Sequence, residues 1–387
     1  SHSKNNKEIK LMSTPFSVRT SAPFRYDVVG SFLRPERLKK ARLDFSQDRI
    51  TKQQLAAVED DCIRDLVEKE IRAGLHSVTD GEFRRSYWHL DFMWGFDGIG
   101  HVEMEHGYFF HGEETRADSA RVFGKIRFSG HPFLKHYQFL QKTVDGRTLT
   151  RQTIPAPAQF FAELVRAENE RYLDDVYPDR EELYRDLTDA YRGFILALYE
   201  SGCRNLQLDD CTWGMLCDKN FWNTMAGDGY SPENLQQLYL RLNNGAIRDL
   251  PGDLTVNTHI CRGNYHSTWA TSGGYAPVAK TLFGGENVRA YYLEFDDSRS
   301  GDFSPLAAVS GEKLVVLGLI TSKRPQLEDK EKIIARIREA SAYVPLDRLC
   351  LSPQCGFAST EEGNVLTERE QWEKIRLIRE IAEEVWG

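Results

Sequence analysis

The feature of the sequence that most constrains the fold is a regular alternation of short apolar runs with longer amphipathic stretches, from residue 26 to the end of the chain. Short apolar runs are typical of buried strands, and the longer stretches repeat apolar residues at helical spacing. The eight strand candidates are YDVVGSF (26–32), LHSVTDGEF (75–83), QTIPAPA (152–158), NLQLDD (205–210), LTVNTHICRG (254–263), AYYLEFDD (290–297), KLVVLGLI (313–320) and LCLSPQCGF (349–357). Eight strands that alternate with helices predict an α/β fold, a (β/α)8 TIM barrel. A doubly wound open sheet is the alternative, because periodicity does not show whether a sheet closes.

Helix-ending signals support this alternation. The stretch 180–202 has apolar residues at helical spacing and ends in Gly202, a residue that is common just after the last turn of a helix. The last stretch, 367–386, begins with Thr367 and has Glu370 three residues later, which is the signature of a capping box. We therefore expect long helices in both places.

One segment interrupts the rhythm after the second strand. Residues 99–137 alternate polar and apolar side chains between glycine-containing turns, which predicts an inserted antiparallel hairpin that serves as a lid or partner surface. Residues 1–20 are polar and lack the apolar segment of a signal peptide, so we expect a flexible extension. No repeat or linker-like composition divides the rest, and we expect one domain over residues 21–387.

Charge and cysteine content narrow the classes of function. The 387 residues carry a net charge of −8, which argues against general nucleic-acid binding. The chain contains no apolar run near the ~20 residues that span a bilayer. Seven cysteines spread over a long chain do not suit a disulfide framework and favour a reducing compartment. We therefore expect a cytoplasmic protein that acts on small molecules; the sequence leaves open whether it forms homo-oligomers.

Polar side chains gather where the predicted strands end, which is where a parallel barrel carries its active site. His259 and Cys261 stand two residues apart in one strand, so both side chains project to the same face. Glu294 ends the next strand and Cys355 ends the last. Imidazole, thiolate and carboxylate groups are zinc ligands, and this spacing favours a zinc site. Taken singly, a buried cysteine is more often a core residue, and Glu294 could pair with Arg299.

These motifs also carry a family resemblance. The chain resembles the catalytic domain of cobalamin-independent methionine synthase, within the barrel superfamily that includes uroporphyrinogen decarboxylase, over nearly its whole length from residue 26. The likeness is strongest at VVGSF, TDGEF, LQLDD, NTHIC, YLEFDDSRS and SPQCGF. It implies a single-barrel relative whose zinc ligands are His259, Cys261, Glu294 and Cys355. It also implies that Ser31, Glu82 and Asp209 hold homocysteine, which is sensible because two carboxylates suit an ammonium group.

The implied reaction is transfer of a methyl or other alkyl group to a thiol such as homocysteine, which gives a thioether such as methionine. A thiol with a pKa of about 8.5 is mostly protonated at neutral pH, and coordination to zinc keeps it deprotonated. Glu294 would be the weaker ligand that the substrate replaces, which is the feature expected of a catalytic rather than a structural site.

The methyl donor is where the chain departs from that family. The family's proton-donating histidine, in a D-I-H-S motif after the seventh strand, is replaced here by Thr321, Ser322 and Lys323. The tryptophan that stacks on folate has no counterpart in TIPAPAQFF, and Met215 occupies an acidic folate-binding position. No catalytic acid is therefore assigned, and Lys323 and His89 are the candidates.

Two other functions stay open. One is a thiol–epoxide transferase like the epoxyalkane:coenzyme M transferases, since a strained epoxide needs only protonation of its oxygen. The other is a non-catalytic, zinc-stabilised barrel that serves in interaction or storage. A screen of thiols and alkyl donors against the zinc-loaded protein distinguishes these functions.

Overall fold

The computed structural model describes residues 20–387 except 106, 108, 111–112, 115–116, 219–230, 263–273 and 298–299. The predicted flexible extension, residues 1–20, lies outside the described residues apart from Thr20. The description below concerns the described part of the chain.

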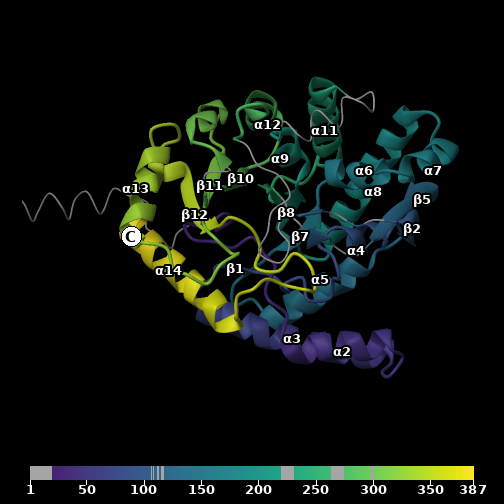
Figure 1. Ribbon diagram of the computed structural model, residues 1–387, viewed down its shortest axis with the longest axis horizontal. Helices are drawn as coiled ribbons and strands as arrows, with labels where there is room; N and C mark the ends of the chain where they lie inside the picture. Colours follow the sequence, from purple (N-terminus) through teal and green to yellow (C-terminus); the bar gives the residue numbers. More distant parts are fainter. Residues whose placement is uncertain are drawn as a thin grey trace, which may run out of the picture.

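A parallel sheet lies at the centre of the molecule, and its strands follow one another in chain order (Figure 1). Six strands pair in the order β12-β11-β10-β9-β8-β7, and every pairing is parallel. Their bounds are β7 Gln152–Pro155, β8 Asn205–Asp210, β9 Thr255–Ile260, β10 Ala290–Glu294, β11 Leu314–Ile320 and β12 Leu349–Pro353. All residues of β7, β8, β10, β11 and β12 are buried, as expected for a parallel sheet covered on both faces. The predicted α/β class is thereby confirmed.

The first two predicted strands are much shorter than their apolar runs. β1 (Ser77–Val78) pairs in parallel with β6 (Leu149–Thr150), which leads directly into β7. Tyr26, in the first predicted strand, forms a parallel bridge with Leu351 of β12. The Phe32 amide donates to the Gly81 carbonyl at 3.1 Å, so these two short segments also meet.

The predicted strand that begins at Tyr26 forms few backbone hydrogen bonds with other strands, because side chains of distant residues donate hydrogen bonds to its carbonyl groups. Arg151 donates to the Val28 carbonyl at 2.8 Å and Gln207 donates to the Val29 carbonyl at 2.7 Å. Gly30 then adopts φ +135°, a conformation that a strand of L-residues does not continue through. This turn brings Ser31 to the end of the barrel where the other strands also end.

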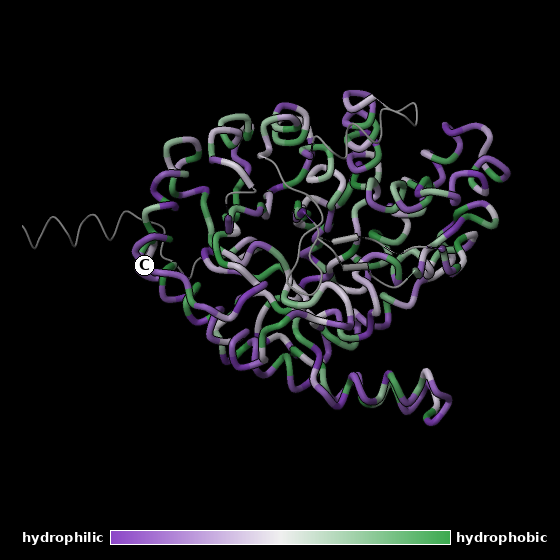
Figure 2. The backbone as a smooth tube through the Cα atoms, viewed as in Figure 1, coloured by the Kyte–Doolittle hydropathy of each residue, from purple (hydrophilic) through white to green (hydrophobic). Residues whose placement is uncertain are grey.

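Helices surround the strands on the outside (Figure 1). Thr51 caps the helix α3 with a capping box, and Thr367 and Glu370 form the predicted capping box of α14. The tube of α2 and α3 alternates purple and green in Figure 2, as expected for helices that bury one face. None of the helices in the described ranges is long and apolar enough to cross a membrane. The bounds are α2 Glu36–Ser46, α3 Lys52–Arg72, α4 Leu90–Met93, α5 Pro132–Val144, α6 Pro157–Leu164, α7 Asn169–Val176, α8 Arg180–Glu200, α9 Thr212–Leu216, α11 Pro232–Ala246, α12 Ala279–Gly285, α13 Lys330–Ala340 and α14 Glu368–Trp386, with short 3-10 helices η3 Ser304–Ala308 and η4 Leu346–Arg348.

The predicted antiparallel insertion is present after β1, with different limits. β2 (Asp97–Glu103) pairs antiparallel with β5 (Asp118–Arg127), and β3 (Phe109–Phe110) pairs with β4 (Glu113–Glu114) between them. The hairpin therefore ends at residue 127 rather than 137. Residues 132–137 instead begin α5, because the His131 side chain accepts a hydrogen bond from the Phe133 amide and caps that helix.

Candidate metal and substrate site

Three of the four predicted zinc ligands lie together at the carboxyl ends of the strands. The ligand atoms of His259, Cys261 and Cys355 are all within 4.8 Å of one another. His259 lies in β9, Cys261 is the first residue after the end of β9, and Cys355 comes two residues after the end of β12. The three side chains are 2%, 6% and 3% exposed, so any ion there would be shielded from water.

The loop that carries Cys355 is hydrogen-bonded to Ser31, near the end of the first predicted strand. The Phe357 amide donates to the Ser31 carbonyl at 3.0 Å, and the Ala358 amide donates to Ser31 Oγ at 3.2 Å. A Cβ atom on Gly356 would lie 1.9 Å from Ser31 Oγ, so a larger residue between Cys355 and Phe357 would force the Ser31 side chain to move. The predicted substrate residue Ser31 therefore also positions a predicted metal ligand.

The electrostatics of the cluster suit a cation. Burial lowers the pKa of His259, but the hydrogen bond with Asp209 and the charge of a Cys355 thiolate outweigh it and raise this pKa above its usual value. The hydrogen bond with Cys261, together with burial, raises the pKa of Cys355 far above that of an ordinary thiol. Two thiolates so close together repel each other, and a bound cation would remove that repulsion.

Glu294, the fourth predicted ligand, is buried next to this cluster but is engaged elsewhere. It ends β10 and its Oε2 accepts a hydrogen bond from the Arg262 amide at 3.2 Å. Its Oε1 lies 3.9 Å from Nζ of Lys323, which makes a closer pair with Asp296 at 2.8 Å. The group of three ligand atoms within 4.8 Å does not include Glu294.

The predicted substrate residue Glu82 has an unusual backbone and an unusual carboxyl group. Its φ of +62° is in the left-handed region, which is costly for a residue other than glycine and is found mostly at functional sites. Arg85 Nη1 pairs with its Oε1 at 2.8 Å. Burial raises the pKa of Glu82 to about 7; the Arg85 charge lowers it and the Asp209 charge raises it. Two predicted carboxylates therefore influence each other at the same end of the barrel.

Asp209, a predicted substrate residue, contacts the predicted metal ligand His259. Its Oδ1 accepts a hydrogen bond from Gln207 Nε2 at 2.8 Å and lies 3.3 Å from Nδ1 of His259. His259 Nε2 lies 3.1 Å from the Gln354 carbonyl oxygen. A carboxylate that holds the second nitrogen of a histidine is a common support of metal sites. Asp209 is thus placed to orient His259, a predicted metal ligand.

The two candidate acids have different surroundings. Lys323 is 4% exposed and its ammonium group is held by Asp296, as described above. His89 lies 3.8 Å from a carboxylate oxygen of Glu163, and its ring is 4.7 Å from the ring of Trp88. Trp88, the residue before His89, packs against the buried cysteines of the site.

Sequence reasoning missed Cys211. It directly follows the LQLDD motif, and its Sγ lies 2.8 Å from Sγ of Cys261. The available signal was its position at the end of a predicted strand, the same criterion that selected Cys261.

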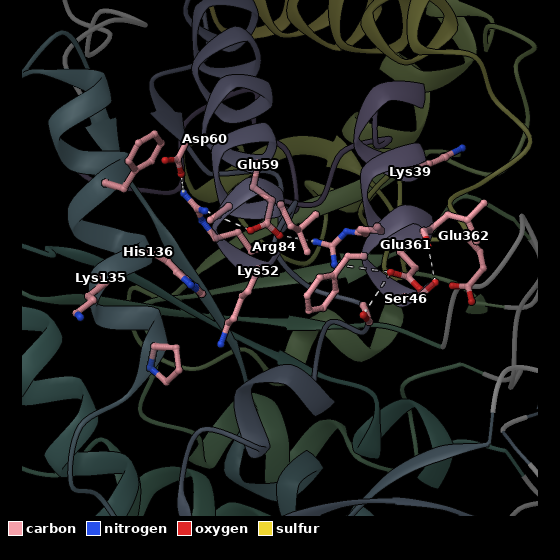
Figure 3. A pocket seen from close by; sticks show the side chains of 18 residues that line it. Lys39, Ser46, Lys52, Glu59, Asp60, Arg84, Lys135, His136, Glu361 and Glu362 are labelled. Carbon is pink, nitrogen blue, oxygen red and sulfur yellow. Dashed lines mark hydrogen bonds and ion pairs between the residues drawn. The ribbon is translucent and has the colours of Figure 1, made fainter. Parts of the chain in front are cut away.

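A hollow lined by residues of α2 and α3 lies apart from this site (Figure 3). This groove, of about 950 Å³, is bordered by helix α5 and by residues that precede α14. Arg84 points toward Glu59 and Asp60, with N–O distances of 3.5 and 2.6 Å (Figure 3). The lining of this groove includes none of the predicted metal ligands or substrate residues.

The comparisons with known proteins cover nearly the whole chain. The family model described as the catalytic domain of cobalamin-independent synthase matches residues 24–384. The chain belongs to this family. The cobalamin-independent synthase fold, a TIM barrel, extends here over nearly the whole chain.

Members of the family differ widely in their sequence identity to this chain. The uncharacterised Bacillus subtilis protein YxjG is 47% identical, over 95% of this chain and 96% of its own. A solved structure from Listeria monocytogenes, provisionally assigned as a vitamin-B12-independent methionine synthase, is 41% identical, with a TM-score of 0.76 and coverage of 95% of this chain and 100% of that chain. The Pyrococcus abyssi methionine synthase is 23% identical over 85% of each chain.

Proposed function

We propose that this protein is a zinc-dependent transferase that moves a methyl group to a small thiol, with homocysteine as the preferred acceptor. Its family supports methyl transfer to homocysteine in general. The observation that carries the proposal is the buried cluster of His259, Cys261 and Cys355 at the carboxyl ends of the strands.

The donor set fits zinc. Two thiols and one imidazole within 4.8 Å of one another are typical zinc ligands, and catalytic zinc sites have three protein ligands and a fourth, exchangeable position. Both ring nitrogens of His259 have protein partners; the ion would replace one contact and the other would orient the ring. Zinc bound there would supply the Lewis acidity that keeps a substrate thiol deprotonated at neutral pH. Glu294, the predicted fourth ligand, would first have to release the Arg262 amide.

The other predicted residues would hold the amino-acid end of the acceptor. Glu82 and Asp209 are close enough for the charge of Asp209 to raise the pKa of Glu82, so an ammonium group between them would relieve that repulsion. The Ser31 hydroxyl already accepts the Ala358 amide and can donate its proton to a carboxylate.

Proton delivery to the donor's leaving group falls to Lys323 or His89. Lys323 is held by Asp296 and lies near Glu294, whereas His89 lies beside Trp88. Cysteine ligands must also stay reduced to bind a metal, so we propose a reducing location such as the cytoplasm.

Metal content and product formation test this proposal together. Purified protein should contain close to one zinc per chain and form a thioether from homocysteine and a methyl donor, detected by mass spectrometry. Cys355→Ser should lose both zinc and activity, whereas the control Cys350→Ser should keep them, because Cys350 is buried in a separate small cluster with Tyr292 and Val316. Zinc retained in full by Cys355→Ser would contradict the assignment.

A further inference from the structure

A network of buried polar side chains lies just before the strand ends that carry the predicted site. Arg151, the residue before β7, is 1% exposed, and its guanidinium group pairs with Asp27 at 3.2 Å. The same group donates to the Val28 carbonyl at 2.8 Å and to Gln207 Oε1 of β8 at 2.7 Å. Tyr292 of β10 donates its hydroxyl proton to Asp27 at 2.8 Å. Arg151 therefore connects the first predicted strand with β8 and β10.

Stability alone does not account for the ion pair in this network. Val, Ile and Leu dominate the interior of most parallel barrels. The replacement of a buried ion pair by packed apolar side chains is often neutral or stabilising, because the two charges must be taken out of water. Arg151 and Asp27 are both at most 2% exposed. The pair is better explained by the neighbouring side chains that it positions.

Gln207 has one amide orientation that suits its partners. Its Oε1 accepts from Arg151, and its Nε2 donates to the Val29 carbonyl at 2.7 Å and to Asp209 Oδ1 at 2.8 Å. A side-chain amide has two N–H groups, so both are used here. The reversed amide would direct its oxygen at two acceptors and its N–H groups at a cation. Arg151 therefore fixes Gln207 as a donor to Asp209.

Asp209 connects this network to a predicted metal ligand. Gln207 and Asp209 are two residues apart in β8, so their side chains lie on the same face of the strand. Asp209 stands opposite His259 in the pairing of β8 with β9, and its Oδ1 lies 3.3 Å from Nδ1 of the ring. The oxygen that faces the imidazole is thus the one that accepts from Gln207. A carboxylate orients a histidine well when other hydrogen bonds hold that carboxylate in place.

We propose that Gln207, held by Arg151, is a positioning residue for His259, because it fixes the Asp209 carboxylate against the imidazole ring. This inference rests on the proposed function, since it takes His259 as a zinc ligand. Gln207 and Arg151 are not ligands in this arrangement and act through Asp209. The position that the substrate thiol would occupy at the metal is therefore left unchanged.

Zinc affinity, measured in competition with a chelator, tests the positioning without relying on activity. Asp209→Ala should weaken zinc binding by the roughly 10–100-fold that is lost with an outer partner of a metal ligand. Gln207→Met, which is similar in size but has no amide, should weaken it by roughly tenfold, the lower end of that range. The matched control is Gln152→Met, which should bind zinc as the wild type does. Gln152 is a buried glutamine of the neighbouring strand β7, and its Nε2 donates to the Thr153 carbonyl at 3.0 Å.

Double variants separate positioning from a general structural effect. In an Asp209→Ala background, Gln207→Met should cause no further loss of zinc affinity, because the carboxylate through which it acts is absent. Arg151→Lys keeps a positive charge beside Asp27 but lacks the planar fork that also reaches Gln207, so it should show the same dependence on Asp209. Equal losses in both backgrounds would overturn the inference, as would a Gln207→Met variant that binds zinc as tightly as the wild type.

A crystal structure of zinc-loaded wild-type protein decides the question even if the variants fail to fold. Asp209 should keep its contacts with both Gln207 Nε2 and His259. A carboxylate turned away from either one would overturn the inference and leave the proposed function standing. Wild-type protein that binds no zinc would overturn both.

Discussion

The raised pKa of Glu82 makes amino-acid binding depend on pH in the neutral range. Burial lifts this pKa from 4.5 to about 7 despite the pairing with Arg85. An ammonium group attracts only the ionised carboxylate, so binding should weaken as the pH falls through 7. Methionine is the suitable ligand, because it carries the same ammonium group as homocysteine and has no thiol to titrate.

The size of the effect follows from the pKa. With a pKa of about 7, Glu82 is about 90% ionised at pH 8 and about 10% ionised at pH 6. The apparent affinity for methionine should therefore fall about tenfold between these values, which corresponds to about 1.4 kcal/mol. Binding should also release protons, about half a proton per methionine at pH 7 and nearly one at pH 6, because the bound ammonium favours the ionised form.

Titration calorimetry in two buffers of different ionisation enthalpy measures both quantities. Glu82→Gln should bind methionine weakly at every pH and release no proton. Methylthiobutanoate, which is methionine without its amino group, is the control ligand and should gain nothing when Glu82 ionises. An affinity for methionine that is constant from pH 6 to 8, or a Glu82→Gln variant that keeps the wild-type pH dependence, would refute the role of Glu82.

Two further predictions concern the loop of Cys355 and the methyl donor. Gly356→Ala places a Cβ atom 1.9 Å from Ser31 Oγ, so we expect a loss of about 1–3 kcal/mol in the free energy of unfolding. Urea denaturation measures this loss, which Ser31→Ala should partly reverse in the double variant; an unchanged midpoint would contradict the packing argument. Methionine formation from free methyltetrahydrofolate should be slow compared with that from a sulfonium donor, because the segment with Thr321, Ser322 and Lys323 lacks the proton-donating histidine, Lys323 is held by Asp296, and general acid catalysis is worth roughly 10²–10⁴-fold. Steady-state rates with both donors test this, and comparable rates would mean that another residue, such as His89, supplies the proton.

The sequence was most informative where the chemistry of a segment is local. Apolar runs predicted β10, β11 and β12 because a strand covered on both faces has no polar side to display. The capping box at Thr367 predicted the start of α14, since its hydrogen bonds join residues three apart. The run from Tyr26 was predicted too long, because Arg151 and Gln207, far away in sequence, compete for its carbonyl groups.

The sequence by itself determined the residue types at the strand ends, and with them the chemistry available to the site. Only the tertiary structure decided which side chains meet. His259 and Cys261 could be paired from their spacing, but the proximity of Cys211 depends on the register between β8 and β9, which residues 50 positions apart establish through backbone hydrogen bonds. The same holds for Glu294, whose carboxylate is held by Arg262 and Lys323. Ligand identity is a property of single residues, whereas ligand geometry is a property of the packed sheet.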